Sequence, residues 1–309
     1  MKILIFGRGA IGTQYAWAFE KAGHTVEFYV REGRKVEYGS YVNLEMWDMR
    51  KRKRDRLTKE KWQIVTHEEI ERNHDYDLIF MSVNPEQVSG ATEYLASRVG
   101  NATVLFFCNF WEDPEAALYP ISPSQIVYGF PSAGGGFEGN TLYGGLYKTV
   151  KFGTFGLALS KRDLAVHKLF TDAGFRIKVS NDFQNWLWNH FAFNVAMEVE
   201  VLKSGSFKAV VSSPESLAGI GSNMKEIVRV LKAKGAKLDV LSKILNVLPP
   251  KMVGFFLSKL VFSPESMSYA LVEHNHYKVG YAVNEVIAEA RKQGISAPRL
   301  YAVERIITT

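Results

Sequence analysis

The stretch that decides the fold is Lys2-Ile3-Leu4-Ile5-Phe6-Gly7-Arg8-Gly9-Ala10-Ile11-Gly12. Its first five residues predict a short buried strand, and the glycines open a predicted helix over Ile11 to Ala22. A glycine loop in this context cradles a pyrophosphate, because its glycines permit a tight turn, close backbone approach and close helix packing. The N–H groups at the helix N-terminus then face the anion. We therefore predict that residues 7–12 bind a cofactor; the alternative is a purely structural glycine turn.

The same alternation of strand and helix patterns continues through the first half of the chain. Near-continuous apolar runs of this kind are typical of parallel strands buried on both faces. The runs are residues 25–30, 78–82, 103–108 and 126–128. Residues 130–159 are rich in Gly, Tyr and Thr and predict antiparallel strands that close the sheet. The fold class is therefore α/β, with an N-terminal Rossmann-type doubly wound sheet.

The second half of the chain has helical patterns only, so we predict an all-α C-terminal domain. Ser180 stands where an N-cap belongs before a long helix over residues 182–203. Ser213-Pro214 and Ser263-Pro264 have the composition of helix starts, and another long helix is predicted over residues 275–293. We place the domain boundary after residue 179. This gives a cofactor-binding Rossmann-type domain over residues 1–179 and a helical C-terminal domain over residues 180–309.

Composition bounds the class of protein and its surroundings. A chain of 309 residues has room for two domains. The single cysteine, Cys108, cannot form an internal disulfide and suits a small buried hydrophobe in a reducing compartment, so we expect a cytoplasmic protein. No apolar stretch approaches the ~20 residues of a membrane span, and we expect neither membrane insertion nor a secretory leader. The net charge of +6 favours an anionic ligand.

The residue after the second predicted strand bears on the choice of cofactor. An NAD site commonly has Asp or Glu there to bind the ribose 2′-hydroxyl, whereas this strand ends in Phe28-Tyr29-Val30 and is closed by Arg31. The guanidinium fork matches a 2′-phosphate, and Arg34 and Lys35 add positive charge. We therefore predict NADPH, although Glu32 is adjacent and the alternative is that Arg31 is a solvated loop residue.

With these motifs, the chain resembles the ketopantoate reductase (2-dehydropantoate 2-reductase) family over nearly its whole length. Besides the glycine loop and Arg31, the resemblance rests on Asn109, Leu187-Trp188 with Asn194, Ser266-Met267, Tyr281 and residues 294–298. The resemblance implies an NADPH-dependent reductase with a Rossmann domain and a helical domain. It also implies that Asn109 lies between nicotinamide and substrate, that Asn194 helps to bind substrate, and that Ser266 contacts the substrate carboxylate.

Four positions depart from the family pattern. His190 stands where the family has its catalytic lysine, and Lys278 stands where it has a glutamate. Glu198 replaces the second asparagine of the helix, and Asn84 replaces the lysine that helps to hold the cofactor phosphate. We keep Asn84 as a cofactor-binding candidate and Glu198 as a substrate-binding candidate. Because two charged groups have changed, we expect ketopantoate itself to be a poor substrate.

The altered residues suggest a different source for the proton that a reduced carbonyl must receive. His190, Asn194 and Glu198 are spaced i, i+4 and i+8, so they form one polar stripe on the predicted helix. A histidine that titrates near neutrality can supply the proton, which makes His190 the leading acid, with Lys278 and Asn194 as further catalytic candidates. A core histidine is the alternative. Lys278 is predicted to pair with Glu198 across the helices; exposure of Lys278 to solvent is the alternative.

The remaining features give less specific signals. The run Arg50 to Arg56 lacks interleaved aromatic residues and predicts a solvated loop; nucleic-acid binding is the weaker alternative. His274-Asn275-His276 lacks further ligands at a metal spacing, so no metal site is predicted. The combined prediction is an NADPH-dependent reductase of a 2-oxo acid or related small carbonyl compound. The alternative is an NADP(H)-binding protein with little catalysis that acts through a partner. A homodimer is possible, and the sequence does not decide the oligomeric state.

Overall fold

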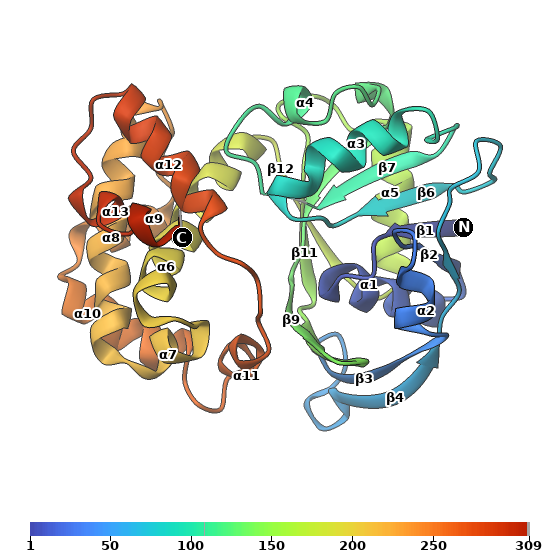
Figure 1. Cartoon of the computed structure of the whole chain (residues 1–309), viewed down its shortest axis with the longest axis horizontal. Coiled ribbons are helices and arrows are strands. Elements are labelled where there is room, and N and C mark those ends of the chain that lie inside the picture. Colours follow the sequence, from blue (N-terminus) through green and yellow to red (C-terminus); the bar gives the residue numbers. More distant parts are fainter. Residues whose placement is uncertain (108, 308–309) are drawn as a thin grey trace. The chain divides into compact units, whose positions relative to one another are not determined.

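The computed structural model of the chain describes residues 1–107 and 109–307 (Figure 1). Cys108 lies outside the described residues, so its predicted role as a buried hydrophobe stays a prediction. The chain divides into two compact units, Met1–Phe183 and Gln184–Thr309, and each is described by itself. The predicted domain boundary after residue 179 also stays a prediction.

The N-terminal unit is built on an eight-stranded sheet with the order β12-β11-β8-β7-β6-β1-β2-β5. Six neighbouring strands of this sheet are parallel: β5, β2, β1, β6, β7 and β8. Strand β11 runs antiparallel to β8, and β12 runs parallel to β11. A central β1 from which the strand order reverses confirms the doubly wound fold. The strand bounds are β1 Lys2–Phe6, β2 Thr25–Tyr29, β5 Thr66–His67, β6 Leu78–Met81, β7 Thr103–Phe107, β8 Ile126–Phe130, β11 Thr149–Gly153 and β12 Arg176–Ser180.

Helices cover this sheet on both faces. On one face lie α1 (Ala10–Lys21) and α5 (Lys161–Asp172), whose Phe19 and Phe170 rings meet at 5.0 Å. Figure 1 shows α3 (Val88–Ala96) on the other face. Side chains of β6 and β7 alternate between the two faces of the sheet, and both faces are covered. Both strands are therefore buried along their whole length and are apolar at every position but Thr103. Shorter segments lie in the connections between strands: α2 (Arg34–Tyr38), α4 (Pro114–Ala117) and the 3₁₀ turns Lys53–Asp55, Pro85–Gln87 and Pro123–Gln125.

A second sheet has the order β4-β3-β10-β9, with bounds β3 Tyr41–Asp48, β4 Leu57–Gln63, β9 Ala133–Glu138 and β10 Thr141–Leu146. The prediction that residues 130–159 close the main sheet is therefore wrong for β9 and β10 and holds for β11 alone. The glycines explain the difference, because a Cβ at Gly144 would lie 2.7 Å from the Gln14 side-chain amide of α1. Their absent side chains let the second sheet pack on α1.

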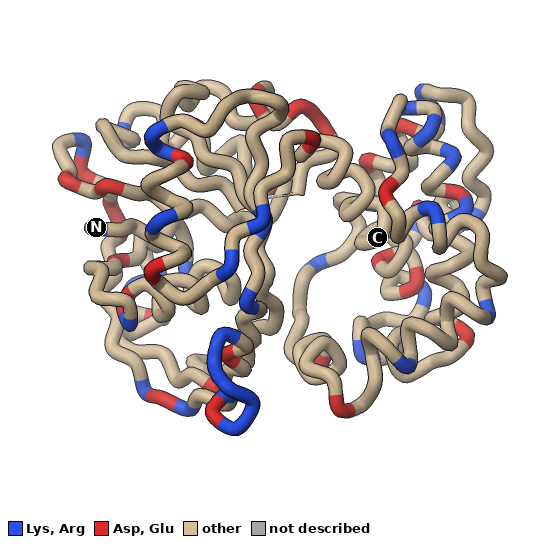
Figure 2. Tube along the Cα trace, turned by 180° about the vertical axis from the view of Figure 1, so that it is seen from behind, with Lys and Arg blue, Asp and Glu red and all other residues tan. Residues whose placement is uncertain are grey.

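The basic run joins β3 to β4 and forms the dense blue loop of Figure 2. Residues 51–55 are exposed, which confirms the predicted solvated loop for this part of the run. The prediction is wrong for Arg50, which is largely buried, donates from Nε to Asp48 at 2.8 Å and donates to the Ala173 carbonyl at 2.6 Å. Arg50 thus anchors the base of the loop.

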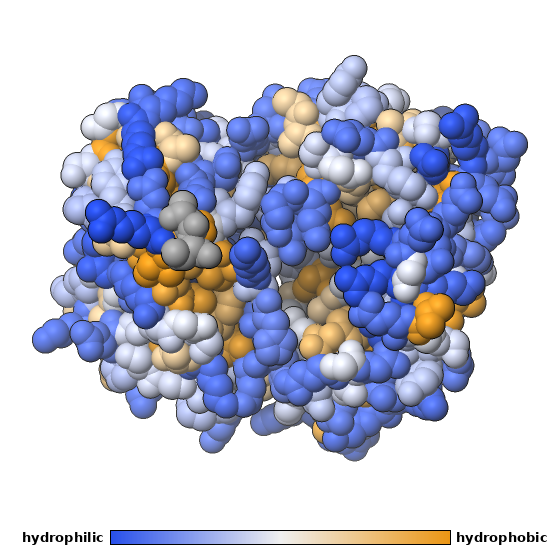
Figure 3. Space-filling view, in the orientation of Figure 1, coloured by the Kyte–Doolittle hydropathy of each residue, from blue (hydrophilic) through white to orange (hydrophobic). Residues whose placement is uncertain are grey.

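The C-terminal unit is all-α, as predicted. Its centre is α8 (Pro214–Ala233), against which α7, α9, α10, α12 and α13 pack. No helix of the described residues is both long and apolar enough to cross a membrane. In the view of Figure 3 most of the surface is hydrophilic, with apolar areas on each unit. The helix bounds are α6 Phe183–Ser204, α7 Phe207–Ser212, α9 Val240–Val247, α10 Pro250–Phe256, α11 Met267–Glu273, α12 Tyr281–Lys292, α13 Pro298–Tyr301 and α14 Glu304–Ile307, with a π-helical turn at Leu257–Val261.

Helix starts were predicted unevenly. Ser213 caps α8 as expected, since its side chain accepts the Ser216 amide at 3.2 Å. The start at Ser263-Pro264 is wrong by one turn, because Ser266 rather than Ser263 caps α11.

Two further boundaries differ from the sequence prediction. The helix predicted from residue 275 begins only at Tyr281, after Gly280 with a φ of +123° that no helix accommodates. Ser180 is the last residue of β12 and not an N-cap. For these helices of the C-terminal unit, the sequence pattern therefore predicted the element and misplaced its first residue.

Candidate cofactor site

The glycine loop has the geometry that its sequence predicts. Gly7 has a φ of +89°, which favours glycine, and its N–H donates to the Tyr29 carbonyl at 2.8 Å, joining the loop to the end of β2. A Cβ at Gly12 would lie 2.8 Å from Ile5 Cγ2, so only glycine lets α1 approach β1 this closely. A Cβ at Gly9 would meet open space. The loop is thus tight at Gly7 and Gly12 and open where a ligand would approach Gly9.

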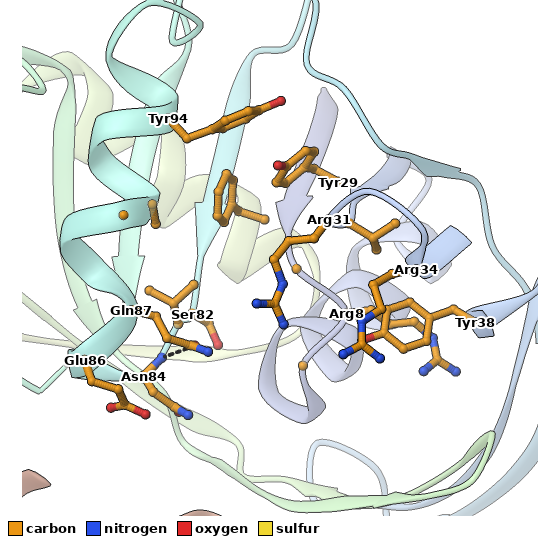
Figure 4. A pocket seen from close by; sticks show the side chains of 17 residues that line it. Arg8, Tyr29, Arg31, Arg34, Tyr38, Ser82, Asn84, Glu86, Gln87 and Tyr94 are labelled. Atoms are coloured by element: carbon orange, nitrogen blue, oxygen red, sulfur yellow. Dashed lines mark hydrogen bonds between the residues drawn. The ribbon is translucent and has the colours of Figure 1, made fainter. Parts of the chain in front are cut away.

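A cavity of about 670 Å³ lies in front of this loop, at the carboxyl ends of β1, β2 and β6 (Figure 4). Its lining comes from Phe6–Gly9, from the segment Tyr29–Tyr38 after β2, and from the segment Ser82–Tyr94 after β6. The edge at which strand order reverses is where ligands of open α/β sheets bind. Every lining residue belongs to the N-terminal unit, so this unit alone forms the cavity.

Three arginines line the cavity: Arg8, Arg31 and Arg34. In Figure 4 the Arg31 side chain extends between the Asn84–Gln87 segment and the pair Arg8 and Tyr38. Arg31 lies two residues beyond the end of β2, one residue further than predicted, and is exposed. Arg34 forms an ion pair with Glu37. Among the described lining residues Glu86 is the one acid, so the cavity favours anions.

Arg8 has a different environment from Arg31. Its guanidinium stacks on the Tyr38 ring at 4.7 Å and on the Phe137 ring at 4.3 Å, and it donates to Asn140 Oδ1. Burial lowers the pKa of Arg8 below its ordinary value. Arg8 Nε is buried and finds no hydrogen-bond partner among the described residues. Arg8 thus ties the glycine loop to α2 and the second sheet.

An aromatic wall of the cavity went unpredicted. The Tyr29 and Tyr94 rings stack at 4.8 Å with an interplanar angle of 22°, and Phe6 lies 4.7 Å from Tyr29. Burial raises the pKa of Tyr29 above its ordinary range, so its hydroxyl stays protonated. Tyr29 is the last residue of β2, and its position beside Arg31 was a signal that the sequence offered. Tyr94 sits within α3, and its sequence context gave none.

Two predicted asparagines lie in this unit. Asn84 lines the cavity after β6, and its backbone N–H donates to Gln87 Oε1 at 3.2 Å, which shapes the turn. Asn109 is half-buried and follows β7, which ends at the same carboxyl edge of the parallel sheet. Asn84 therefore lies beside the glycine loop and Arg31, whereas Asn109 does not line this cavity.

The polar stripe of the C-terminal unit lies on α6, as its spacing predicts. His190 is half-buried, with its ring stacked on Trp186 at 5.1 Å, and Asn194 is also half-buried. Glu198 is buried and accepts a hydrogen bond from the Gly280 amide at 3.2 Å. Lys278 is exposed. This exposure is the alternative stated for Lys278 in the sequence analysis, and a contact between Glu198 and Lys278 stays a prediction.

Ser266 has a structural task in the same unit. Its hydroxyl accepts the Tyr269 amide at 3.1 Å and donates to the Val261 carbonyl at 2.8 Å. A hydroxyl has one hydrogen to donate. Contact with a substrate carboxylate would therefore require Ser266 to give up its bond to Val261.

The sequence matches two models of one protein family. The model described as ketopantoate reductase PanE/ApbA matches residues 3–156, and the model of the C-terminal part of the same family matches residues 182–309. The chain belongs to the ketopantoate reductase family. This membership confirms the resemblance drawn from the glycine loop, Arg31 and the C-terminal motifs, and it makes the chain a member of an oxidoreductase family.

Solved structures share the fold at low sequence identity. A ketopantoate reductase of the PanE/ApbA family from Ralstonia eutropha JMP134 has a TM-score of 0.75 at 16% identity, covering 100% of this chain and 97% of the other. D-mandelate dehydrogenase with NADH and anilino(oxo)acetate has a TM-score of 0.71 at 16% identity, with coverage of 100% and 97%. A dimeric ketopantoate reductase from Staphylococcus aureus has a TM-score of 0.66 at 12% identity, with coverage of 99% and 98%. No curated protein sequence matches this chain.

Proposed function

We propose that this member of the ketopantoate reductase family is an NADPH-dependent reductase of a 2-oxo acid or related carbonyl compound. The observation that carries the proposal is the cavity in which Arg31 and Arg34 stand beside the open glycine loop. Glu32, the nearest acid to Arg31 in sequence, is exposed and does not line the cavity. A guanidinium in this position matches a 2′-phosphate, whereas a carboxylate would match a free ribose hydroxyl.

The residues of the cavity fit a dinucleotide in three respects. The N–H groups of residues 7–12 suit the pyrophosphate, the arginines suit further phosphate charge, and the Tyr29–Tyr94 wall offers aromatic surface to an adenine. The unpartnered Nε of Arg8 adds a buried donor at the loop. When bound, the nicotinamide supplies the hydride for carbonyl reduction. Asn84 and Asn109 are the remaining proposed cofactor contacts, and Asn109 is also proposed to contact substrate.

We assign the proton step to His190. Reduction of a carbonyl leaves an alkoxide, which a protonated imidazole can neutralise as it forms. Asn194, one helical turn further along α6, is proposed to orient the substrate, with Glu198 and Ser266 as further substrate candidates. Lys278 is the competing proton donor, because its exposed ammonium also carries a transferable proton.

The substrate is proposed to be a 2-oxo acid other than ketopantoate. The family's lysine and glutamate are His190 and Lys278 in this chain, which changes the charge that an anionic substrate meets. D-mandelate dehydrogenase, a structural neighbour, was solved with anilino(oxo)acetate, and this supports a wider choice of 2-oxo acids in this fold.

A panel of 2-oxo acids that includes ketopantoate, followed by loss of NADPH absorbance, tests the proposal. We expect turnover of at least one member, a kcat/KM for ketopantoate below about 10⁴ M⁻¹s⁻¹, and weaker binding of NADH than of NADPH by calorimetry. Efficient ketopantoate turnover would contradict the substrate assignment. Equal affinity for both cofactors would contradict the assignment of NADPH.

The second candidate is an NADP(H)-binding protein that acts through a partner rather than a product. It gains support if NADPH binds and no carbonyl compound of the panel is reduced. The homodimer and the cytoplasmic location also stay predictions. The dimeric enzyme from Staphylococcus aureus supports the homodimer, and light scattering of the purified chain measures it.

A further inference from the structure

Arg8 is a charged side chain in the interior of the N-terminal unit. It is only 7% exposed, although it stands in the glycine loop and lines the cavity. Its guanidinium contacts neutral groups, which are the rings of Tyr38 and Phe137 and the amide oxygen of Asn140. Figure 4 shows Arg8 beside Tyr38. Because arginine keeps its proton in proteins, a full positive charge is buried at the cavity.

No carboxylate pairs with this charge in the described part of the chain. Glu37 is the one acid that acts on Arg8 electrostatically, and it is exposed and already paired with Arg34. The Nε of Arg8 is buried and has no hydrogen-bond partner among the described residues. Ring stacking and one amide hydrogen bond offset part of the cost of burying the charge. A buried charge is normally compensated by an opposite charge, which Arg8 lacks here.

The second sheet holds this charge in place. Asn140, in the turn between β9 and β10, accepts a hydrogen bond from Arg8 and donates from Nδ2 to the Tyr41 carbonyl of β3 at 2.8 Å. Phe137 of β9 supplies one of the two rings. A long arginine side chain usually extends its charged group into water, whereas these contacts keep the guanidinium beside the glycine loop. The second sheet thus positions a cation at the cavity.

We propose that Arg8 is the cation that neutralises the pyrophosphate of the bound dinucleotide. This inference rests on the proposed function and deepens it. The pyrophosphate is assigned to the N–H groups of the glycine loop, and Arg8 is the one charged residue of that loop. The pyrophosphate is common to NADPH and NADH, whereas the 2′-phosphate assigned to Arg31 is present in NADPH alone. Arg8 therefore sets the affinity for both dinucleotides, and Arg31 sets the preference between them.

Calorimetric titration of the full chain with NADPH, NADH and 2′-AMP tests this division. Arg8→Met keeps an unbranched stem and removes the charge. We expect it to weaken NADPH and NADH by the same factor, roughly tenfold to a hundredfold, because charge-assisted hydrogen bonds are lost. Binding of 2′-AMP should hardly change, because this ligand has the 2′-phosphate and the adenine but no pyrophosphate. Arg31→Ala should give the opposite pattern, with losses for NADPH and 2′-AMP and little change for NADH.

Thermal unfolding without ligand provides a second readout. Removal of an uncompensated buried charge should leave the melting temperature of Arg8→Met at or above the wild-type value, whereas loss of a purely structural contact would lower it. Arg98→Met is the matched control. Arg98 also stacks on an aromatic ring of the cavity, that of Tyr94 at 4.4 Å, but does not itself line the cavity. This variant should bind all three ligands as the wild type does.

Four results with Arg8→Met would overturn the proposal. Unchanged affinity for both dinucleotides would show that Arg8 contributes no binding, and a loss confined to NADPH would assign Arg8 to the 2′-phosphate. A loss that includes 2′-AMP would mean that the cavity has changed shape, and a lower melting temperature would mean that Arg8 stabilises the unliganded fold. If the wild type binds neither dinucleotide, the proposed function fails together with this inference, whereas each of the four results rejects the role of Arg8 alone.

Discussion

The cavity at the glycine loop and the interior of the C-terminal unit use charged side chains in opposite ways. Around the cavity three arginines face one lining acid, and Arg31 is exposed. Within the C-terminal unit, Glu200 Oε1 accepts from Asn223 at 2.9 Å and from Arg299 at 3.2 Å, and Arg299 Nε donates to Asn223 at 2.7 Å. Arg31 makes no ion pair among the described residues, although Arg34 pairs with Glu37. The charges that support the fold of the C-terminal unit are closed into hydrogen bonds.

The largest expected effect tests whether the C-terminal unit also has a charged group that acts on a ligand, which would break this comparison. His190→Ala should lower kcat about 10² to 10⁴-fold on the substrate that the panel identifies, because general acid catalysis contributes this much. NADPH affinity should stay near wild type, since His190 does not line the cavity. Steady-state kinetics and calorimetry measure the two quantities.

Lys278→Ala is the control for the His190 variant. A large loss with Lys278→Ala and a small one with His190→Ala would transfer the proton step to Lys278. A wild-type rate that falls as pH rises through the neutral range supports an imidazolium donor, because only the protonated ring donates. A flat profile from about pH 5 to 8 contradicts it.

The second effect tests whether the exposed charge of Arg31 in the cavity binds the cofactor. Arg31→Ala should weaken NADPH binding about tenfold to a hundredfold, since hydrogen bonds to charged groups contribute about 1.5 to 3 kcal/mol. NADH affinity should hardly change, because NADH has no 2′-phosphate. Arg54→Ala, which removes an exposed arginine outside the cavity, is the matched control in the same calorimetric titration. An equal loss for NADPH and NADH would show that Arg31 contacts a part common to both.

The contrast also explains what the sequence could predict. The roles of Gly7 and Gly12 follow from backbone geometry, which a strand–loop–helix pattern specifies locally, and the structure confirms both. The pairing of β10 with β3 joins segments about a hundred residues apart, so no local sequence pattern predicts it. The overlooked signal for the second sheet was the apolar alternation of Val42, Leu44 and Met46, which are buried on one face of β3.

Side-chain roles were harder to predict than backbone roles. Ser266 was expected at a substrate and caps a helix, and Tyr94 lines the cavity without any motif around it. A side chain's task depends on which neighbours the fold brings to it. The spacing of His190, Asn194 and Glu198 predicted a shared helix face correctly, but spacing alone does not assign the chemistry of that face.

The third effect tests the closed network of the C-terminal unit. Arg299→Met should destabilise this unit by about 1 to 3 kcal/mol, because Asn223 and the buried Glu200 each lose a hydrogen-bond partner. Arg291→Met is the matched control: it breaks an ion pair with Glu304 at the surface, where solvent replaces the lost contact, and should lower the free energy of unfolding less. Chemical unfolding followed by circular dichroism compares the two variants. Equal destabilisation would mean that the network has no more weight than a surface pair.

The smallest effect concerns a histidine of the N-terminal unit that belongs to neither class of charged group. His167 packs against the Phe152 ring at 4.6 Å, its Nε2 has no hydrogen-bond partner among the described residues, and burial lowers its pKa below the ordinary 6.5. Because the unfolded chain binds the proton more readily, the stability associated with the neutral ring is present above pH 6.5 and is lost as the pH falls through the folded pKa. His167→Phe keeps the aromatic contact and removes the titration, so its urea midpoint should fall less than that of the wild type between about pH 7.5 and 5.5. Parallel midpoints for the two proteins would show that His167 takes up its proton in the folded state without cost.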